Sequence, residues 1–276
     1  MEPVLEVKNL VVEHLRKKQK QTIIKGIDFK VFPGQCLGIL GESGSGKSMS
    51  LKAVMGLLGA DFSVTGEALF GGENLIGKTR EQLRQIRGKR IAMILQNPMT
   101  CFDPLYRIED QLSETYREHT ELTRKEIYEK ALAVLTSMQI KNPEEAVKKY
   151  PHQLSGGMLQ RIMIGLAMSM EPDLLIADEP TTAIDAITQF EIMKEFIRIK
   201  KESNTAMIFI SHDLGVISAI SDEVLVLNNG KMADQGTFRQ IYEQPKDPYT
   251  RLLVEKKKAV MDQYHRALGR KGVMSQ

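Results

Sequence analysis

Apolar residues along the chain fall into short strand-like runs separated by helix-like segments. Residues 4–14 and 22–32 alternate apolar and polar positions, which predicts two strands on either side of a charged turn. Four later segments contain a short apolar run, which predicts buried strands: "QCLGIL" at 35–40, "RIAMILQ" at 90–96, "PDLLIADEP" at 172–180 and "TAMIFISHD" at 205–213. Such strands, alternating with helices, predict a mainly parallel sheet with its ligands at the carboxyl ends of the strands.

Helix-like periodicity fills the segments between these strands. Residues 48–59 predict a helix closed by Gly59. From about residue 98 to residue 170 the pattern predicts a helical insert, in which residues 123–140 are amphipathic. Residues 222–237 predict a closing hairpin with "NNG" at its turn.

A glycine-rich loop follows the third predicted strand. Its sequence "GESGSGKS", from Gly41 to Ser48, fits the pattern G-x-x-x-x-G-K-[ST] between a strand and a helix, the context in which the pattern marks a phosphate site. The glycines allow backbone angles that turn successive N–H groups toward phosphate oxygens. We expect Lys47 to reach the β- and γ-phosphates and the Ser48 hydroxyl to coordinate Mg²⁺.

Polar residues end the strands that follow this loop. Asp178 ends an apolar strand, where we expect it to hold Mg²⁺ through water. Glu179 points to the opposite face and is expected to polarise a water for attack on the γ-phosphate. Gln96 and His212 end two further strands, where a glutamine positions water or Mg²⁺ and a histidine contacts the γ-phosphate or orients Glu179. Alone, each of these two residues is also compatible with a structural role.

A second helix start has the features of an anion site. In "LSGGMLQR", residues 154–161, Ser155 is a natural N-cap, and Gly156 and Gly157 open an apolar-rich helix. Backbone N–H groups at such a start favour an anion. The phosphate loop lies elsewhere in the chain, so this helix start has no ligand of its own.

Composition limits the class of protein. The chain has 276 residues, of which 26% are charged and 42% hydrophobic, as in an ordinary globular protein. A net charge of +3 is too small to argue for nucleic acid as a partner. Two cysteines without metal-ligand spacing indicate a reducing, cytoplasmic compartment, and the first residues lack the pattern of a signal peptide. The apolar runs are too short to span a membrane, so we expect any membrane role to come through a partner.

Together these motifs closely resemble the nucleotide-binding subunit of ABC transporters. The resemblance covers about residues 3–245 and rests on "GESGSGKS", Gln96, "LSGGMLQR", "LLIADEP", "TTAIDA" and "FISHD", which stand in the family's order. It implies an α/β fold, a P-loop NTPase ABC cassette with a RecA-like core, an N-terminal antiparallel β subdomain and an inserted helical subdomain. The implied boundaries are 1–96 and 171–245 for the ATP-binding core with its β subdomain, 97–170 for the helical signature subdomain and 246–276 for a C-terminal extension.

The resemblance also assigns roles residue by residue. It implies that Glu179 is the catalytic glutamate, Gln96 the Q-loop glutamine and His212 the switch histidine, with Asp185 as the D-loop aspartate. ATP and Mg²⁺ are the implied cofactors, and the expected Mg²⁺ ligands are Ser48, Gln96 and Asp178. The residues expected to bind the nucleotide are Gly41, Glu42, Ser43, Gly44, Ser45, Gly46, Lys47, Ser48, Met49 and Asp178, together with His14.

His14 is a departure from the family pattern. It stands near the end of the first predicted strand, where the family usually has an aromatic residue that stacks on adenine. An imidazole ring stacks less extensively than a larger aromatic ring. An exposed residue at the end of a strand is the alternative interpretation of this position.

The resemblance accounts for the second helix start. In this family two cassettes stack head to tail, and the signature segment of one covers the ATP held by the other. By that likeness Ser155, Gly156 and Gly157 hold a γ-phosphate that the neighbouring subunit mainly binds, and Gln160 belongs to the same signature segment that acts in trans. The chain alone is then expected to hydrolyse ATP poorly.

The same resemblance implies a set of partners. They are a second, related ABC ATPase in a heterodimer, two transmembrane permease subunits, and an extracellular or periplasmic substrate-binding protein. This places the chain peripherally on the cytoplasmic face of the cell membrane. An apolar patch of Met99, Phe102, Leu105 and Tyr106 is the expected docking surface for a membrane subunit, and a core for the helical subdomain is the alternative.

Finer features resemble the peptide/nickel importer branch of the family. They are "QNPMTCFDPLYRI", "LLIADEPTTAID" and the late "QPKDPYTRLL". Leu159 before Gln160, and the lack of any cysteine after Cys101, lean toward the nickel-import ATP-binding subunit. Nickel or a nickel chelate is therefore the expected cargo, and a di- or oligopeptide importer ATPase is the alternative.

Two further alternatives fit the sequence less well. A non-transport ABC ATPase of DNA repair or translation usually has two cassettes or a long coiled-coil insert, whereas this chain has one cassette without sustained heptads. A regulatory cassette with weak hydrolysis is disfavoured because Glu179 and His212 are both present.

Overall fold

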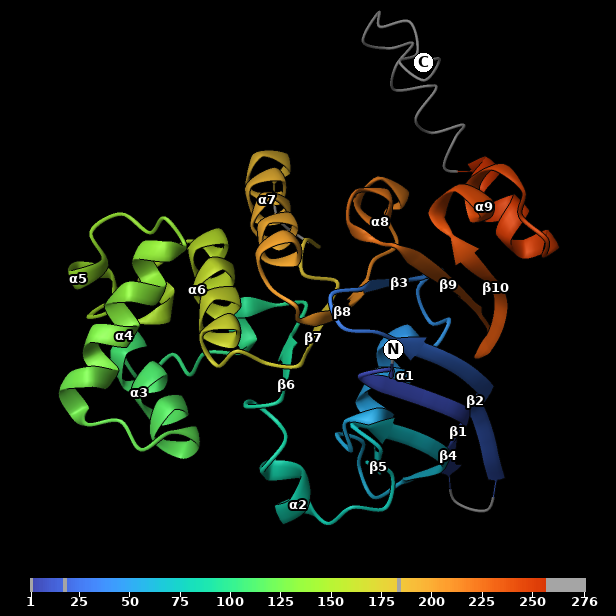
Figure 1. Cartoon of the computed structure of the whole chain (residues 1–276), viewed down its shortest axis with the longest axis horizontal. Coiled ribbons are helices and arrows are strands. Elements are labelled where there is room, and N and C mark those ends of the chain that lie inside the picture. Colours follow the sequence, from blue (N-terminus) through green and yellow to red (C-terminus); the bar gives the residue numbers. More distant parts are fainter. Residues whose placement is uncertain (1, 17–18, 183–184, 257–276) are drawn as a thin grey trace, which may run out of the picture.

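Two sheets form the α/β part of the chain, and a group of helices lies beyond the β6 edge of the larger sheet (Figure 1). The computed structural model describes residues 2–16, 19–182 and 185–256. The smaller sheet is antiparallel, in the order β2-β1-β4-β5, and consists of β1 (Leu5–Arg16), β2 (Gln19–Val31), β4 (Phe62–Phe70) and β5 (Glu73–Asn74).

The larger sheet has the order β10-β9-β3-β8-β7-β6 and is parallel except for β10. It agrees with the predicted mainly parallel sheet. Its strands are β3 (Cys36–Leu40), β6 (Ile91–Ile94), β7 (Leu174–Asp178), β8 (Ala206–Ile210), β9 (Glu223–Asn228) and β10 (Lys231–Thr237).

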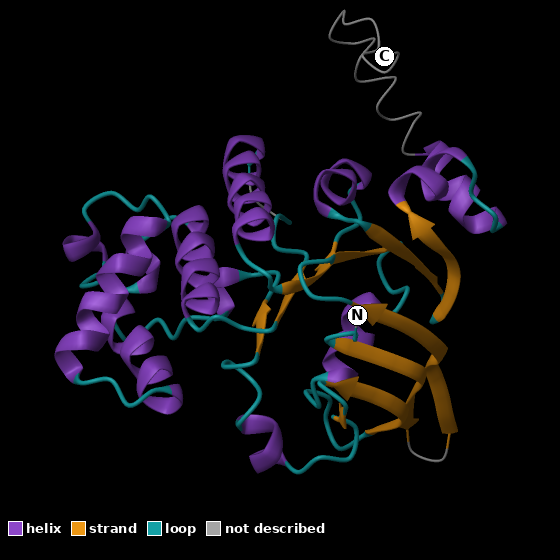
Figure 2. Ribbon diagram, in the orientation of Figure 1, coloured by secondary structure: helices purple, strands orange, loops and turns teal. Residues whose placement is uncertain are grey.

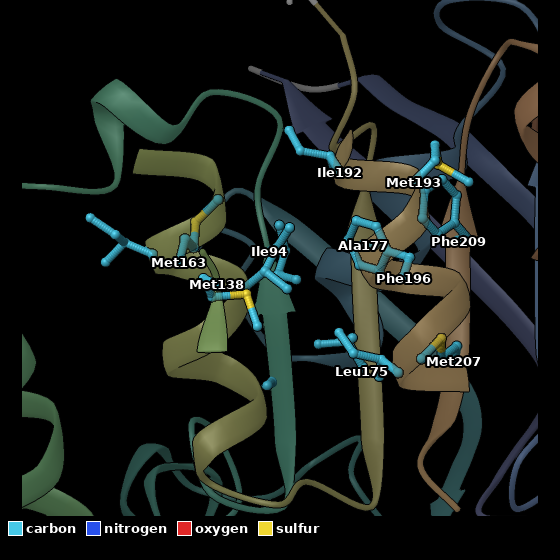
Figure 3. Packing of buried hydrophobic residues seen from close by; sticks show 14 of the residues in the cluster. Ile94, Met138, Met163, Leu175, Ala177, Ile192, Met193, Phe196, Met207 and Phe209 are labelled. Carbon is cyan, nitrogen blue, oxygen red and sulfur yellow. The ribbon is translucent and has the colours of Figure 1, made fainter. Parts of the chain in front are cut away.

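The continuous apolar runs are explained by burial on both faces of this sheet. Successive residues of a strand point to opposite faces. Leu37 and Ile39 therefore pack in one core with α1 and the smaller sheet, whereas Cys36 and Leu40 belong to a second core with the helices of the opposite face. Figure 3 shows this second core, where Phe196 of α7 meets Phe209 of β8 edge to face, with ring centroids 5.0 Å apart.

The helices surround the larger sheet and build the insert (Figure 2). Between β6 and β7 the described chain is helical apart from its loops, and Thr123 starts the amphipathic helix α4 with a capping box to Glu126. The helices are α1 (Lys47–Val54), α2 (Arg80–Arg84), α3 (Ile108–His119), α4 (Arg124–Ser137), α5 (Pro143–Ala146), α6 (Gly156–Ser169), α7 (Ala186–Glu202), α8 (Leu214–Ile220) and α9 (Phe238–Glu243), with short 3₁₀ turns at Pro98–Thr100 and Pro151–Gln153. None of the helices within the described ranges is long and apolar enough to cross a membrane.

The domain boundaries at residues 96, 170 and 245 stay predictions. Residues 248–256 of the expected C-terminal extension are helical, and residues 257–276 lie outside the described part of the chain.

The first predicted helix ends earlier than expected. Instead of closing at Gly59, α1 ends at Val54, and Gly56 follows with φ of 61°. The N–H of Leu57 donates to the carbonyl of Lys52 at 2.8 Å, the bond of a Schellman motif. The sequence offers two glycines as helix stops, and the earlier one terminates the helix.

The predicted hairpin turn is confirmed, and it also supports the phosphate loop. β9 and β10 meet at Asn229 and Gly230, whose φ values are 47° and 76°. The N–H of Gly230 donates to the carbonyl of Ser45 at 2.9 Å, and the Gly230 carbonyl accepts from the N–H of Lys25 at 2.8 Å. A Cβ at this glycine would overlap the carbonyl oxygen of Ile23. The turn is therefore wedged between β2 and the loop.

We expect Gly230→Ala to lower the free energy of unfolding by about 2–4 kcal/mol, because it adds backbone strain to a steric overlap with Ile23. Urea denaturation of the full chain measures the loss. Gly72→Ala is the matched control, since Gly72 also has a positive φ of 85° but a Cβ there would have no atom within 4 Å. The control should lose only about 1–2 kcal/mol. Equal losses in the two variants would show that the close packing of Gly230 contributes nothing.

Candidate functional site

The loop of residues 41–48 joins β3 to α1 at the carboxyl end of the parallel sheet. Gly44 and Gly46 have φ values of 81° and 104°, a region that glycine adopts freely. The ammonium group of Lys47 folds back and donates to the carbonyls of Gly41 at 2.9 Å and Glu42 at 3.0 Å. The buried Ser45 hydroxyl has no hydrogen-bond partner among the described residues. A buried unsatisfied hydroxyl and a buried ammonium group suit a phosphate ligand.

The lysine of this loop is almost fully buried and lies near two carboxylates. Burial lowers the pKa of Lys47, and the negative charges of Glu179 and Asp178 oppose that change. Its ammonium nitrogen lies 4.0 Å from Oε1 of Glu179. The positive charge is thus concentrated at the loop, where it attracts an anion.

Ser48 and Asp178 form the oxygen-rich part of the site. The Ser48 hydroxyl donates to Oδ1 of Asp178 at 2.6 Å, which joins α1 to the end of β7. Asp178 is only 5% exposed. Burial raises the pKa of its carboxyl group, while the hydrogen bond from Ser48 and the charge of Lys52 act in the opposite direction. Hydroxyl and carboxylate oxygens are the ligands that Mg²⁺ prefers, so the pair fits that ion.

Glu179 is the meeting point of three other side chains. Its Oε2 accepts hydrogen bonds from Nε2 of Gln96 at 3.2 Å and from the Thr182 hydroxyl at 3.0 Å. Nδ1 of His212 lies 3.5 Å from the same oxygen. Gln96 and His212 come from the loops after β6 and β8, on either side of β7 in the sheet. In this structure Gln96 bonds to Glu179 rather than to Ser48 or Asp178.

The backbone of Glu179 is strained. Its φ is 47°, a left-handed value that costs a residue with a side chain roughly 1–3 kcal/mol. Its N–H donates to the carbonyl of Ile210 in β8 at 3.1 Å, so the sheet holds this conformation in place. The strain turns the carboxylate toward Gln96, Thr182 and Lys47.

Thr182 is a site residue that the sequence reasoning missed. It lies three residues after Glu179, a spacing at which a threonine hydroxyl can bond back to a preceding turn residue. The repeated threonines after "DEP" were the only local signal.

The signature segment lies apart from the chain's own phosphate loop. Ser155 caps α6 by accepting from the N–H of Met158 at 3.3 Å. No recorded hydrogen bond or ion pair between described residues joins 155–160 to 41–48. Gln160 is 1% exposed, and its amide nitrogen has no partner among the described residues. Gln160 is thus buried, whereas Ser155 is exposed. The role of this segment toward a partner's nucleotide stays a prediction.

Asp185 and Gly157 connect the starts of two helices. Asp185 caps α7 by accepting from the N–H groups of Ile187 at 3.1 Å and Thr188 at 3.0 Å. A Cβ on Gly157 would lie 2.5 Å from the methyl group of Thr188. The start of α6 thus packs against the first turn of α7.

His14 and Met49, the outer residues of the expected nucleotide set, are half-buried. Nε2 of His14 lies 2.8 Å from a carboxylate oxygen of Asp61, and its ring stacks on Phe62 with centroids 4.6 Å apart. Met49 packs against the core that α1 shares with the smaller sheet. The contact of His14 with an adenine stays a prediction.

The expected docking patch is only partly exposed. Met99, Leu105 and Tyr106 are exposed, but Phe102 is 7% exposed and belongs to the core of the helical subdomain. The inclusion of Phe102 in the surface patch was wrong, because the subdomain needs this aromatic ring for its own packing. Of the exposed residues, Tyr106 lines a groove of about 750 Å³ between the loop after β6, α3 and α6.

Comparison with known proteins identifies the family to which the chain is similar. A family model described as ABC transporter matches residues 24–182. The chain is 42% identical over 258 residues to the metal-staphylopine import system ATP-binding protein CntD of Staphylococcus aureus, which covers 92% of this chain and 95% of that protein. It is 41% identical over 256 residues to the dipeptide transport ATP-binding protein DppD of Bacillus subtilis, which covers 92% of this chain and 76% of that protein.

A solved structure supports the fold. CbiO1 from Clostridium perfringens, part of the ABC transporter complex CbiONQ, matches with a TM-score of 0.73 at 26% identity, over 95% of this chain and 100% of that one. These matches confirm the predicted α/β cassette fold, with a P-loop core and an antiparallel β subdomain.

We expect Asp178→Asn to raise the melting temperature of the ligand-free chain at neutral pH, because it removes a buried charge and keeps an oxygen for Ser48. Each 1 kcal/mol gained corresponds to about 2–4 °C in a protein of this size. The folded-state pKa of Asp178 is raised, so the native state binds more protons above the unfolded pKa, and stability falls as pH rises through that window. The gain should therefore vanish in acid, below the ordinary carboxylate range.

The measurement is a pH series of thermal unfolding curves. Asp173→Asn is the control, since it removes an exposed carboxylate, paired with Arg90 at 2.8 Å, just before the same strand. It should give no gain at any pH. A melting temperature for Asp178→Asn that is unchanged at neutral pH would contradict the assigned cost of this charge.

Proposed function

Because the chain belongs to the ABC transporter family, we propose that its ATP hydrolysis drives the import of a metal ion held by a small organic chelator. The chain is the ATP-binding and ATP-hydrolysing subunit of an ABC importer. One observation carries the proposed catalytic roles, namely the convergence of Gln96, Thr182 and His212 on one oxygen of Glu179 beside the phosphate loop.

In the proposed reaction Glu179 accepts a proton from the water that attacks the γ-phosphate. The donors Gln96 and Thr182 hold one of its carboxylate oxygens, which leaves Oε1 to face Lys47. Lys47 offsets the negative charge that spreads over the transferred phosphoryl group. His212 is exposed and lies beside the carboxylate of Glu179. We therefore expect its side chain to move when the nucleotide binds or when the partner cassette covers the site.

Ser48 and Asp178 are the proposed Mg²⁺ ligands, with Gln96 as the third expected one. The ion, when bound, neutralises charge on the β- and γ-phosphates. The short hydrogen bond between Ser48 and Asp178 keeps both oxygens at one place before the ion arrives. Burial disfavours the negative charge of Asp178, and a cation bound there would offset this cost.

A second, related ATPase is the proposed source of the missing contacts to ATP. Ser155 is exposed at the start of α6, and a Cβ on Gly156 would have no atom within 4 Å. In the described part of the chain neither residue has a hydrogen bond to the phosphate loop. We expect this helix start to cover a γ-phosphate held by the neighbouring cassette. The chain alone should accordingly hydrolyse ATP slowly.

A transmembrane permease is the proposed occupant of the groove beside α6. Leu105 is 78% exposed and Tyr106 57% exposed, which is unusual for such large apolar side chains. They follow Gln96 in sequence, so a partner in the groove would be connected to the Glu179 cluster through one short loop. The proposed assembly also contains two permease subunits and a substrate-binding protein. In it the chain lies peripherally on the cytoplasmic side of the membrane.

The relatives support a metal chelate as cargo without excluding peptides. Identity is 42% to a metal-staphylopine importer subunit and 41% to a dipeptide importer subunit, a difference too small to decide between them. We propose a chelated metal, with nickel as the expected ion, and a di- or oligopeptide as the second candidate. The cargo does not alter the proposed chemistry at Glu179.

We expect Glu179→Gln to reduce phosphate release by the assembled transporter at least about 100-fold, because glutamine cannot accept the proton of the attacking water. ATP binding should persist, since the phosphate loop is unchanged. Phosphate release at saturating Mg-ATP and equilibrium binding of ATP measure the two effects. Glu202→Gln, at an exposed carboxylate at the end of α7, is the control and should behave as the wild type. Retention of activity in Glu179→Gln would assign hydrolysis to the partner's site.

The cargo is tested with the transporter reconstituted in liposomes with its binding protein. We expect ATPase activity to rise several-fold with a binding protein loaded with a nickel–aminocarboxylate chelate, and Glu179→Gln to remove that rise. Free Ni²⁺ and a dipeptide are the comparison ligands. Stimulation by the dipeptide alone would replace the metal cargo with a peptide and leave the catalytic assignment in place.

A further inference from the structure

The segment after α9 turns back and is fixed to the body of the protein. Asp234 of β10 is buried, and its carboxylate accepts from the backbone N–H groups of Lys246 at 2.8 Å and Asp247 at 3.3 Å. Leu253 and Val254 are buried in the core beneath the helices. Residues 245–256, which we call the C-terminal strut, therefore have a defined position.

The strut reaches the first residues of the phosphate loop. The hydroxyl oxygen of Tyr249 accepts a hydrogen bond from the backbone N–H of Glu42 at 3.0 Å. The ammonium nitrogen of Lys256, also in the strut, lies 3.7 Å from the side-chain carboxylate of Glu42. Burial raises the pKa of Tyr249, so its phenol stays neutral at neutral pH. The two contacts converge on one loop residue from a segment more than two hundred positions away in sequence.

Glu42 is held from its other side by the lysine of the loop. Its carbonyl accepts from the ammonium group of Lys47 at 3.0 Å and from the N–H of Ser45 at 3.2 Å. The N–H side of this residue is bonded to Tyr249 and the carbonyl side to Lys47. Tyr249 thus acts on the part of the loop against which Lys47 is folded.

We propose that Tyr249 is a positioning residue for the phosphate loop, and that the C-terminal strut thereby sets the affinity of the chain for ATP. The inference rests on the proposed function of this loop as the ATP site. A glycine-rich loop loses backbone entropy when it closes on phosphates. A hydrogen bond that already restrains Glu42 lowers that loss and so strengthens binding.

The test is Tyr249→Phe in the full chain, which removes the hydroxyl and keeps the ring. The loss of one hydrogen bond of this kind should raise the dissociation constant for ATP about three- to tenfold. Competition between ATP and a fluorescent ATP analogue measures it without hydrolysis or partners. Tyr128→Phe is the matched control, because it removes a phenol oxygen in the helical subdomain, and its affinity should equal that of the wild type. Wild-type affinity in Tyr249→Phe would overturn the inference.

Two further measurements distinguish a positioning role of Tyr249 from a general contribution to stability. Gly72→Ala strains the turn between β4 and β5, outside the loop, and should leave ATP affinity unchanged at a temperature where the protein is folded. Amide hydrogen exchange should be faster at Glu42 in Tyr249→Phe, and unchanged there in Gly72→Ala and Tyr128→Phe. Unchanged exchange at Glu42 in Tyr249→Phe, or weakened ATP binding in Gly72→Ala, would overturn the positioning role.

Failure of the inference differs from failure of the proposed function. Lys47→Ala should abolish ATP binding, since Lys47 is the cation of the loop. If the wild type does not bind ATP, or if Lys47→Ala binds it equally well, the loop is not the ATP site. If those two behave as expected while Tyr249→Phe binds like the wild type, only the role of Tyr249 is lost.

Discussion

Parallel pairing of β3, β8 and β7 places the carboxyl ends of these three strands side by side at the same end of the larger sheet. The register pairs Ile210 of β8 with Ile39 on one side and with Asp178 on the other, so the loops after these strands begin side by side. Both faces of the sheet are covered, which leaves polar side chains only the strand ends as a place to meet solvent and one another. The phosphate loop, the carboxylates and the residues around Glu179 gather there for this reason.

The site stores an energetic cost that its ligands can relieve. Lys47 and Asp178 are both buried, and in each case burial disfavours the charged form. Glu179 adds a backbone angle that few residues with side chains adopt. A negatively charged nucleotide with its cation supplies opposite charge to both groups. The site is thus less favourable without ligands than a packed apolar core would be, as expected where function limits stability.

Two segments stand in opposite relation to the phosphate loop. The start of α6 has the features of an anion site, but within the described ranges no hydrogen bond or ion pair joins it to the chain's own loop, which is why we propose a ligand held by another subunit. The C-terminal strut touches the loop directly through Tyr249 and Lys256. Thr188 packs against Gly157 at the start of α6, and its hydroxyl donates to Asp185 at the start of α7. A displacement of one helix start would therefore displace the other.

Local patterns in the sequence predict the fold class, the mainly parallel character of the larger sheet and the short motifs, because each depends on neighbouring residues: a loop pattern, an apolar run, a polar strand end. The order of the strands in the sheet came from the structure. Local patterns misplace the end of α1, since Gly56 and Gly59 are equivalent as local stop signals. They also place Phe102 in a surface patch, although it is buried, because burial depends on what packs against a residue and not on its own segment. Only the tertiary structure placed Thr182 and Tyr249 at the site. The bond of Tyr249 to Glu42 joins residues 207 positions apart, and such a contact leaves no local pattern to detect.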